Sequence, residues 1–150
     1  PTLDLFHNAD YHFKFYAAFD LTMHHPVSIP EEADVEQATI ELYNVWPSGE
    51  SDEGVLILTG LVREVWREGT MTWSGAAPYA VGTYTDASYV PRLYSIDVTY
   101  AVVRWLSGAS DNWGIVIDTP LEQQATRFSF ASREHPEEGW RPKLVLHYAW

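Results

Sequence analysis

The sequence contains no cysteine, few basic residues and no long apolar segment. Without cysteine, its 150 residues cannot form disulfides or thiolate metal sites. No apolar run approaches the ~20 residues that cross a bilayer as a helix, so we expect no membrane insertion.

Basic residues are scarce enough to constrain the partners. The formal net charge is −12, from 21 acidic and 9 basic side chains, and Lys14 is the one base in the first 60 residues. Such a chain repels the phosphates of a duplex, so nucleic acid is not an expected partner. Neutral glycans, calcium and cationic partners are compatible with this charge.

Motifs of covalent and phosphoryl-transfer catalysis are missing as well. The sequence has no Gly-x-Ser-x-Gly nucleophile motif, no glycine-rich phosphate loop and no His-x-x-x-His zinc pair. Adjacent carboxylates occur in turn-like segments, which is typical of solvated loops and not of a glycosidase pair: Glu31-Glu32, Asp52-Glu53 and Glu137-Glu138. We therefore expect a protein that is not an enzyme.

Asp111 and Asn112 are weak candidates for a structural calcium site, because they offer hard oxygen ligands. The regular Asp-x-Asp-x-Asp-Gly calcium loop is absent. The alternative is a β-turn in which these two side chains bond to the local backbone. No other cofactor is expected.

The pattern of apolar residues predicts an all-β fold. The length fits one domain over residues 1–150, and 46% of the residues are hydrophobic. Short apolar runs separated by Gly, Pro, Asp and Asn indicate a sandwich or barrel. The expected strands are residues 2–6, 12–21, 37–46, 55–58, 93–98, 113–118, 126–132 and 143–148, and residues 76–91 are expected to be a loop.

Two segments have informative periodicity. One short helix is expected from Val98 to Ser107, because apolar residues recur there at helical spacing, with Asp97 as its cap and Gly108 at its end. In residues 12–21 the side chains alternate between two faces, and Tyr16 falls on the face opposite Phe15.

Aromatic residues are the most informative group for function, since an exposed ring can stack on the apolar face of a sugar. Trp66, Trp73 and Trp105 lie in apolar patterns and are expected in the core. Five others lie in expected loops or, for Trp46, at the end of an expected strand before Pro47. They are candidates for ligand binding or for subunit contacts: Trp46, Tyr79, Tyr84, Tyr89 and Trp140.

Several motifs together resemble one family. Residues 66–73, Trp-Arg-Glu-Gly-Thr-Met-Thr-Trp, are similar to its Trp-x-Glu-x-x-x-Thr-Trp motif. Asp97-Val-Thr with Trp105 is similar to its helix segment, and Arg141-Pro142 with Leu144 to its closing motif. In number and order, these segments resemble the DNRLRE-type (disaggregatase-related) domains, which overlap with a class of carbohydrate-binding modules. The resemblance extends from about Tyr16 to Tyr148.

The resemblance implies a jelly-roll-like β-sandwich in secreted or cell-surface proteins. Some relatives bind polysaccharides such as alginate, and others are parts of large surface proteins. It also implies that the shared motif residues determine the fold: Trp66, Trp73, Asp97, Trp105, Arg141 and Pro142.

One departure from the family leaves a second function open. Family members usually begin with a further strand ahead of the segment that matches residues 1–6, and this chain lacks it. An open sheet edge would result. Either the strand belongs to a part of the protein outside this sequence, or a neighbouring subunit completes the edge with a strand. The sequence therefore predicts an extracellular module that binds polysaccharide or, alternatively, a self-assembling subunit of a fibre, surface layer or virion.

Overall fold

The described part of the chain folds as strands with one α-helix. A computed structural model of the whole chain describes residues 2–7, 12–21, 29, 34–45, 55–68, 83–90, 92–119 and 128–149. Within these ranges lie ten strands, the α-helix α1 (Thr99–Leu106) and a short 3-10 helix, η1 (Glu138–Trp140). The expected all-β fold with one short helix is confirmed.

The strands form two antiparallel sheets. The smaller sheet has the order β2-β1-β9, and its strands are β1 (Thr2–His7), β2 (His12–Phe13) and β9 (Phe128–Ala131). The larger has the order β10-β4-β7-β6-β5-β8-β3. Its strands are β3 (Phe15–Ala17), β4 (Asp34–Tyr43), β5 (Val55–Leu61), β6 (Thr83–Val90), β7 (Leu93–Asp97), β8 (Ile115–Asp118) and β10 (Lys143–Ala149).

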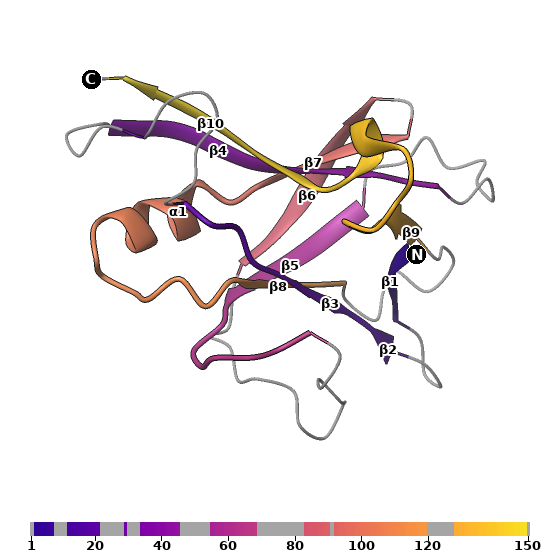
Figure 1. Cartoon of the computed structure of the whole chain (residues 1–150), viewed down its shortest axis with the longest axis horizontal. Coiled ribbons are helices and arrows are strands. Elements are labelled where there is room, and N and C mark those ends of the chain that lie inside the picture. Colours follow the sequence, from indigo (N-terminus) through magenta and orange to yellow (C-terminus); the bar gives the residue numbers. More distant parts are fainter. Residues whose placement is uncertain are drawn as a thin grey trace.

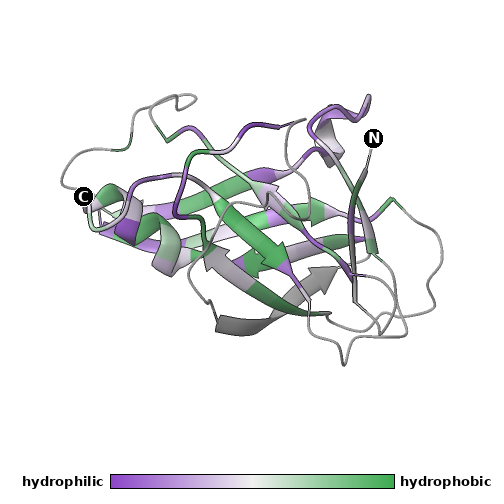
Figure 2. Ribbon diagram, turned by 90° about the horizontal axis from the view of Figure 1, so that it is seen from below, coloured by the Kyte–Doolittle hydropathy of each residue, from purple (hydrophilic) through white to green (hydrophobic). Residues whose placement is uncertain are grey.

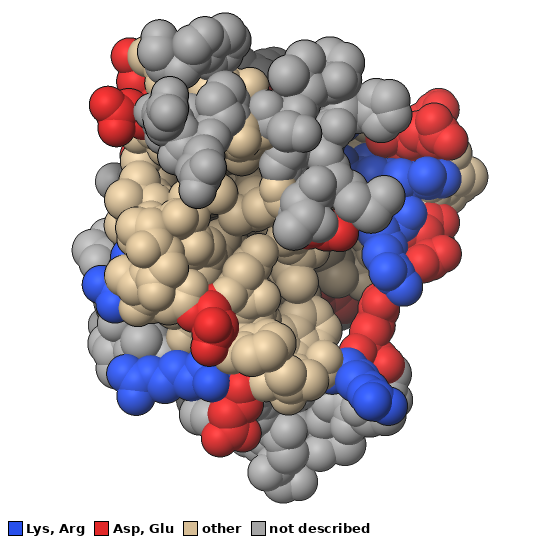
Figure 3. All heavy atoms as spheres, turned by 60° about the vertical axis from the view of Figure 1, so that its left-hand side comes forward, with Lys and Arg blue, Asp and Glu red and all other residues tan. Residues whose placement is uncertain are grey.

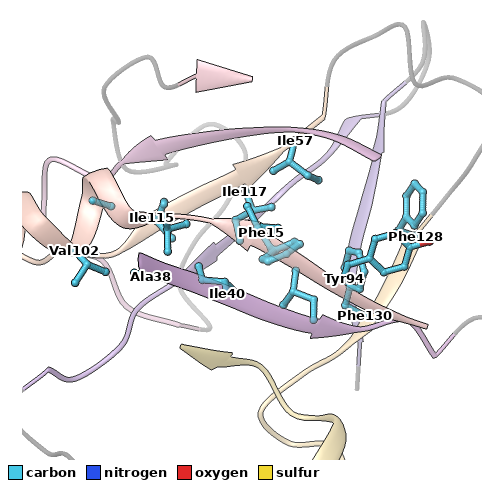
Figure 4. Close-up of a cluster of buried hydrophobic side chains, with 14 of the residues drawn as sticks. Phe15, Ala38, Ile40, Ile57, Tyr94, Val102, Ile115, Ile117, Phe128 and Phe130 are labelled. Carbon is cyan, nitrogen blue, oxygen red and sulfur yellow. The ribbon is translucent and has the colours of Figure 1, made fainter. Parts of the chain in front are cut away.

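The larger sheet folds over, so that its two ends face each other across the core. In Figure 1, β10 and β4 lie above β5, β8 and β3. Alternate residues of β4 point inward, as predicted, because Ala38, Ile40 and Leu42 are at most 1% exposed. Figure 4 shows Ala38 and Ile40 on the side of the core that faces Ile117. Leu42 and Ile57 belong to the same buried cluster. The strands are largely hydrophobic and the connections carry much of the hydrophilic colour in Figure 2.

An aromatic cluster fills one end of this core. Phe128 and Phe130 stack with ring centroids 6.0 Å apart, and Tyr94 meets Phe130 edge-on at 5.7 Å. Phe15 of β3 also meets Phe130 edge-on, at 6.3 Å. The cluster therefore joins β3, β7 and β9, three strands that lie in two different sheets.

Helix α1 closes the other end by bridging the two layers. Asp97 Oδ1 accepts the backbone N–H of Thr99 at 2.9 Å, so the predicted acidic residue does bond at the helix start. Thr99 Oγ1 in turn accepts the N–H of Ala38 in β4 at 2.9 Å, and the Tyr100 hydroxyl donates to the Thr59 carbonyl in β5 at 3.2 Å. Among the described residues, no helix has the length and apolar character to cross a membrane.

Two sequence-based expectations need correction. Residues 12–21 were expected as one strand, but β2 and β3 belong to different sheets, since the chain passes from one to the other at Lys14. Residues 76–91 were expected as a loop, but β6 occupies Thr83–Val90. The Thr, Tyr and Val content of that segment favours a strand, and Arg92 with φ 67° then turns the chain into β7.

In the described part of the chain, the N-terminal strand β1 is not an open sheet edge. β1 lies between β2 and β9, so both of its sides are paired in the described part of the chain. Among the described strands, the larger sheet ends at β10 and β3. β10 carries Lys143 and a register irregularity between His147 and Tyr148, two features that protect edges from pairing. β3 is therefore the edge of greater functional interest.

Gly114 controls how closely β3 and β8 approach, and it gives the first prediction. Its φ is +90°, and an added Cβ would overlap the carbonyl oxygen of Ala17. We expect Gly114→Ala to reduce the free energy of unfolding by about 2–5 kcal/mol, from left-handed strain plus overpacking. Gly108 is the matched control, because its φ is +70° but an added Cβ meets nothing within 4 Å. Urea denaturation should show that Gly108→Ala reduces the free energy of unfolding by about 1–2 kcal/mol. Equal losses for the two variants would contradict the close approach of Gly114 to the Ala17 carbonyl.

Tyr100 gives a second prediction, on pH. Burial raises the pKa of the Tyr100 phenol above its usual value of 10.0. Because the folded state favours the protonated phenol, this contribution to stability is complete below pH 10.0 and is lost as the pH rises beyond it. Thermal unfolding between pH 8 and pH 11 should show a smaller alkaline loss of stability for Tyr100→Phe than for the parent chain. An identical alkaline slope would show that burial of this phenol has no such effect.

Candidate functional site

A groove of about 590 Å³ runs along the edge strand β3. Its volume lies within the range of roughly 300–1,000 Å³ that is usual for ligand sites. Residues 14–20 form one wall, and the remaining lining comes from Leu3, Trp66, Glu68, Ser132, Arg133 and Pro142. We call this hollow the β3 groove. It brings together segments from the start, middle and end of the chain.

Two aromatic rings form the most ligand-like part of the β3 groove. Tyr16 and Trp66 are both half-buried, with ring centroids 5.7 Å apart and planes inclined by 55°. Trp66 was expected in the core, yet it lies in the wall of the groove. Phe15, the neighbour of Tyr16 in β3, also lines the groove, and it is only 6% exposed. The groove therefore presents aromatic surface that is supported from below by the core.

A turn at residues 112–114 holds the two walls of the groove in place. The Trp66 indole N–H donates to the Trp113 carbonyl at 2.6 Å, which fixes the orientation of the ring. Asn112 Nδ2 donates to the Phe19 carbonyl at 2.9 Å, and its Oδ1 accepts the Gly114 N–H at 3.3 Å. The turn is thus hydrogen-bonded both to Phe19, in the segment that follows β3, and to Trp66.

Charged side chains of both signs line the rim. Arg133 Nη2 lies 2.7 Å from Glu68 Oε2, and Arg133 Nε lies 3.0 Å from Glu134 Oε1. Lys14 and Asp20 add one charge of each sign to the lining. Figure 3 shows basic and acidic side chains mixed along the right-hand side of a face that is mostly uncharged. Among the described lining residues, two basic side chains are balanced by two acidic ones.

The loop that carries Arg133 is fastened by the predicted Arg-Pro motif. Arg141 Nε donates to the His135 carbonyl at 2.8 Å, and the guanidinium lies 3.7 Å from Glu138. Pro142 follows directly and lines the groove. Arg141 and Pro142 therefore help to position a wall of the site.

Trp140 lies elsewhere, in an aromatic stack outside the groove lining. Its ring is stacked on Tyr43 with centroids 4.4 Å apart and planes within 10°, and it contacts His135 at 5.1 Å. Because Tyr43 covers one face of the Trp140 ring, Trp140 has less ring surface free for a sugar than the inclined rings of Trp66 and Tyr16 have. The structure thus separates this predicted contact residue from the groove.

The other predicted residues divide into three groups. Trp105 is buried in the core at 8% exposure. Tyr84 and Tyr89 belong to β6, where the structure describes the backbone and not the side chains. Trp46, Trp73 and Tyr79 lie outside the described residues.

Calcium at Asp111 and Asn112 stays a prediction. Asp111 is exposed, while both polar atoms of the Asn112 amide bond to the protein itself. In the described residues, no group of three His, Cys, Asp or Glu side chains has the arrangement of a metal site. The geometry of Asn112 is that of the alternative expectation, a turn that bonds to the local backbone.

A partly buried acid–histidine pair lies outside the groove lining. His12 Nε2 is 2.5 Å from Asp118 Oδ1, and Asp118 also accepts the N–H of Thr119 at 2.7 Å. The Asp118 side chain is 6% exposed. The pair connects β2 of the small sheet to β8 of the large one, and we assign it a structural role.

Sequence reasoning missed Tyr16, Glu68 and Arg133 as site residues. The alternation in residues 12–21 already placed Tyr16 opposite the buried Phe15, so an outward aromatic beside a buried one was the available signal. Glu68 and Arg133 are 65 residues apart in sequence, and no local pattern predicts that they pair.

Comparison with known proteins identifies the family. No curated protein matches the chain. A family model does match, over residues 8–148, and it describes carbohydrate-binding module family 96. The match includes nearly the whole chain and all of the β3 groove except Leu3. It supports the carbohydrate-binding side of the resemblance, and the chain therefore belongs to carbohydrate-binding module family 96.

Proposed function

We propose that the chain binds a polysaccharide in the β3 groove without cleaving it, as a module of an extracellular or cell-surface protein of the DNRLRE type. The observation that carries the proposal is the pair of half-buried rings, Tyr16 and Trp66, in the wall of a 590 Å³ groove. Membership of a carbohydrate-binding family supports it.

The chemistry of the groove suits a sugar chain. A pyranose presents apolar C–H groups on its faces, and these stack on the negative face of an aromatic ring. Its hydroxyl groups lie around the edge, where polar partners are needed. The rim supplies such partners in Lys14, Asp20, Glu68 and Arg133. An inclined pair of rings beside a polar rim fits a bent or twisted glycan chain.

The two carboxylates of the groove lining do not resemble a catalytic pair. Asp20 is exposed, and Glu68 is 65% exposed and paired with Arg133. A glycosidase needs one carboxyl group that stays protonated, usually through burial in an apolar site. Binding alone is therefore the activity that this arrangement supports.

Self-assembly is the second candidate, and the edge position of β3 is what favours it. A strand from a neighbouring copy could pair along β3 and occupy the same groove. Light scattering distinguishes the two candidates, because assembly predicts a mass above 17.1 kDa that falls when the groove is altered.

The binding proposal predicts that Trp66→Ala and Tyr16→Ala each weaken polysaccharide binding at least tenfold, about 1.4 kcal/mol. The reason is the loss of a stacking surface at the centre of the groove. Affinity electrophoresis through gels that contain single polysaccharides would identify the ligand, and calorimetry with its oligosaccharide would give the affinities. Assay of reducing ends in the same samples should show no cleavage.

Trp113→Ala is the matched control. Trp113 is 37% exposed, is absent from the groove lining, and accepts the Trp66 bond through its backbone carbonyl, which alanine retains. This variant should bind as the parent chain does. Equal weakening by Trp113→Ala and Trp66→Ala, or normal binding by Trp66→Ala with an intact fold, would place the site elsewhere.

A further inference from the structure

We propose that the main-chain N–H of Ala18 donates a hydrogen bond to a bound sugar chain, which lies along β3 on the side away from β8. The inference rests on the proposed glycan-binding function. It adds a main-chain contact to the two aromatic rings of the β3 groove. It follows from the directions of the peptide groups between residues 17 and 19.

Two carbonyl groups of this segment point toward the turn at residues 112–114. The Ala17 carbonyl oxygen lies against Gly114, because a Cβ added to Gly114 would overlap that oxygen and would lie farther from the carbonyl carbon. The Phe19 carbonyl accepts a hydrogen bond from Asn112 Nδ2 at 2.9 Å. Both carbonyl groups therefore face the side of β3 on which the turn and β8 lie.

The Ala18 N–H points to the opposite side. In a trans peptide the carbonyl group and the following N–H are antiparallel. Since the Ala17 carbonyl faces the turn, the Ala18 N–H faces away from it. Ala18 is exposed and follows the last residue of β3, so its N–H is not part of the pairing between β3 and β8.

The β3 groove lies on this outward side. Its lining includes Ala18 and the whole segment of residues 14–20, whereas the described residues of the turn and of β8 do not line it. Tyr16, whose ring meets Trp66, lies two residues earlier in the same wall, roughly 7 Å along the chain. A sugar chain that stacks on these rings and continues along the wall passes the Ala18 N–H.

A sugar hydroxyl suits this donor. The edge of a sheet normally binds another strand through its outward main-chain groups. Sugar hydroxyl groups both donate and accept hydrogen bonds, as hydroxyl groups of side chains do, so a glycan can take the place of such a strand. The position of a main-chain donor is fixed by the fold, and its use costs no side-chain ordering.

The direct test follows the main-chain amide signals by NMR during titration of the purified chain with oligosaccharides of alginate, xylan, mannan and a mixed-linkage β-glucan. With an oligosaccharide that binds, the Ala18 N–H signal should move to lower field, and its exchange with solvent should slow. The Ala17 N–H is the internal control, because Ala17 pairs with Ile115 of β8. Its signal should change little.

Ala18→Pro removes the donor itself. Ala17 lies in a strand, which is the conformation that a residue before proline prefers. We expect the affinity for the same oligosaccharide to fall at least about threefold, as for the loss of one hydrogen bond. Ala18→Val is the matched control, because it adds similar bulk and retains the N–H, and it should bind nearly as the parent chain does. Circular dichroism and thermal unfolding check the fold of both variants.

Equal weakening by Ala18→Pro and Ala18→Val would show that bulk is the cause and would overturn the proposal. If Ala18→Pro does not fold, the amide signals decide alone. Binding that depends on Trp66 but leaves the Ala18 N–H signal unchanged would overturn the proposal while the glycan-binding function stands. No binding of any of these oligosaccharides or of their polymers by the parent chain would overturn both.

Discussion

The site depends on the burial of Phe15. β3 has three residues, and its position is set by the contact of the Phe15 ring with Phe130 in the aromatic core and by pairing with β8 at Ile117. Because neighbouring side chains of a strand point to opposite faces, a buried Phe15 requires Tyr16 to point outward. A shift of one residue in this register would bury Tyr16 and remove one ring from the groove. The core therefore determines the binding surface directly.

The turn at residues 112–114 is the second element on which the site depends. It lies between helix α1 and β8, and its contacts reach Phe19 on one wall and Trp66 on the other. Gly114 allows β3 to lie close to this turn, since any side chain there would overlap the Ala17 carbonyl. The helix itself is tied to β4 through Thr99 and to β5 through Tyr100. A series of hydrogen bonds between side chains and backbone groups thus connects the end of the sandwich to the groove.

Sequence patterns predicted the elements better than their assembly. The alternation of Ala38, Ile40 and Leu42 and the helical spacing around Trp105 reflect local periodicity, and both were confirmed. The break between β2 and β3 was missed, because the apolar alternation continues through Lys14 while the chain changes sheets.

The site was harder to predict for a related reason. Trp66 lies among apolar residues, and sequence cannot distinguish a core tryptophan from one in the wall of a groove. The difference comes from tertiary contacts with Tyr16 and Trp113, which are distant in sequence. Trp140 was expected in a loop, but it ends the short 3-10 helix η1 and packs on Tyr43.

The most direct measurement is a titration of the chain with its polysaccharide ligand, followed through the indole N–H signals of its seven tryptophans by NMR. The Trp66 signal can be identified from its loss in Trp66→Phe. The account predicts that Trp66 shows the largest change, because its ring lies in the groove wall, while the signals of Trp105 and Trp140 stay in place. A large change at Trp140 with none at Trp66 would contradict the assignment of the β3 groove as the binding site.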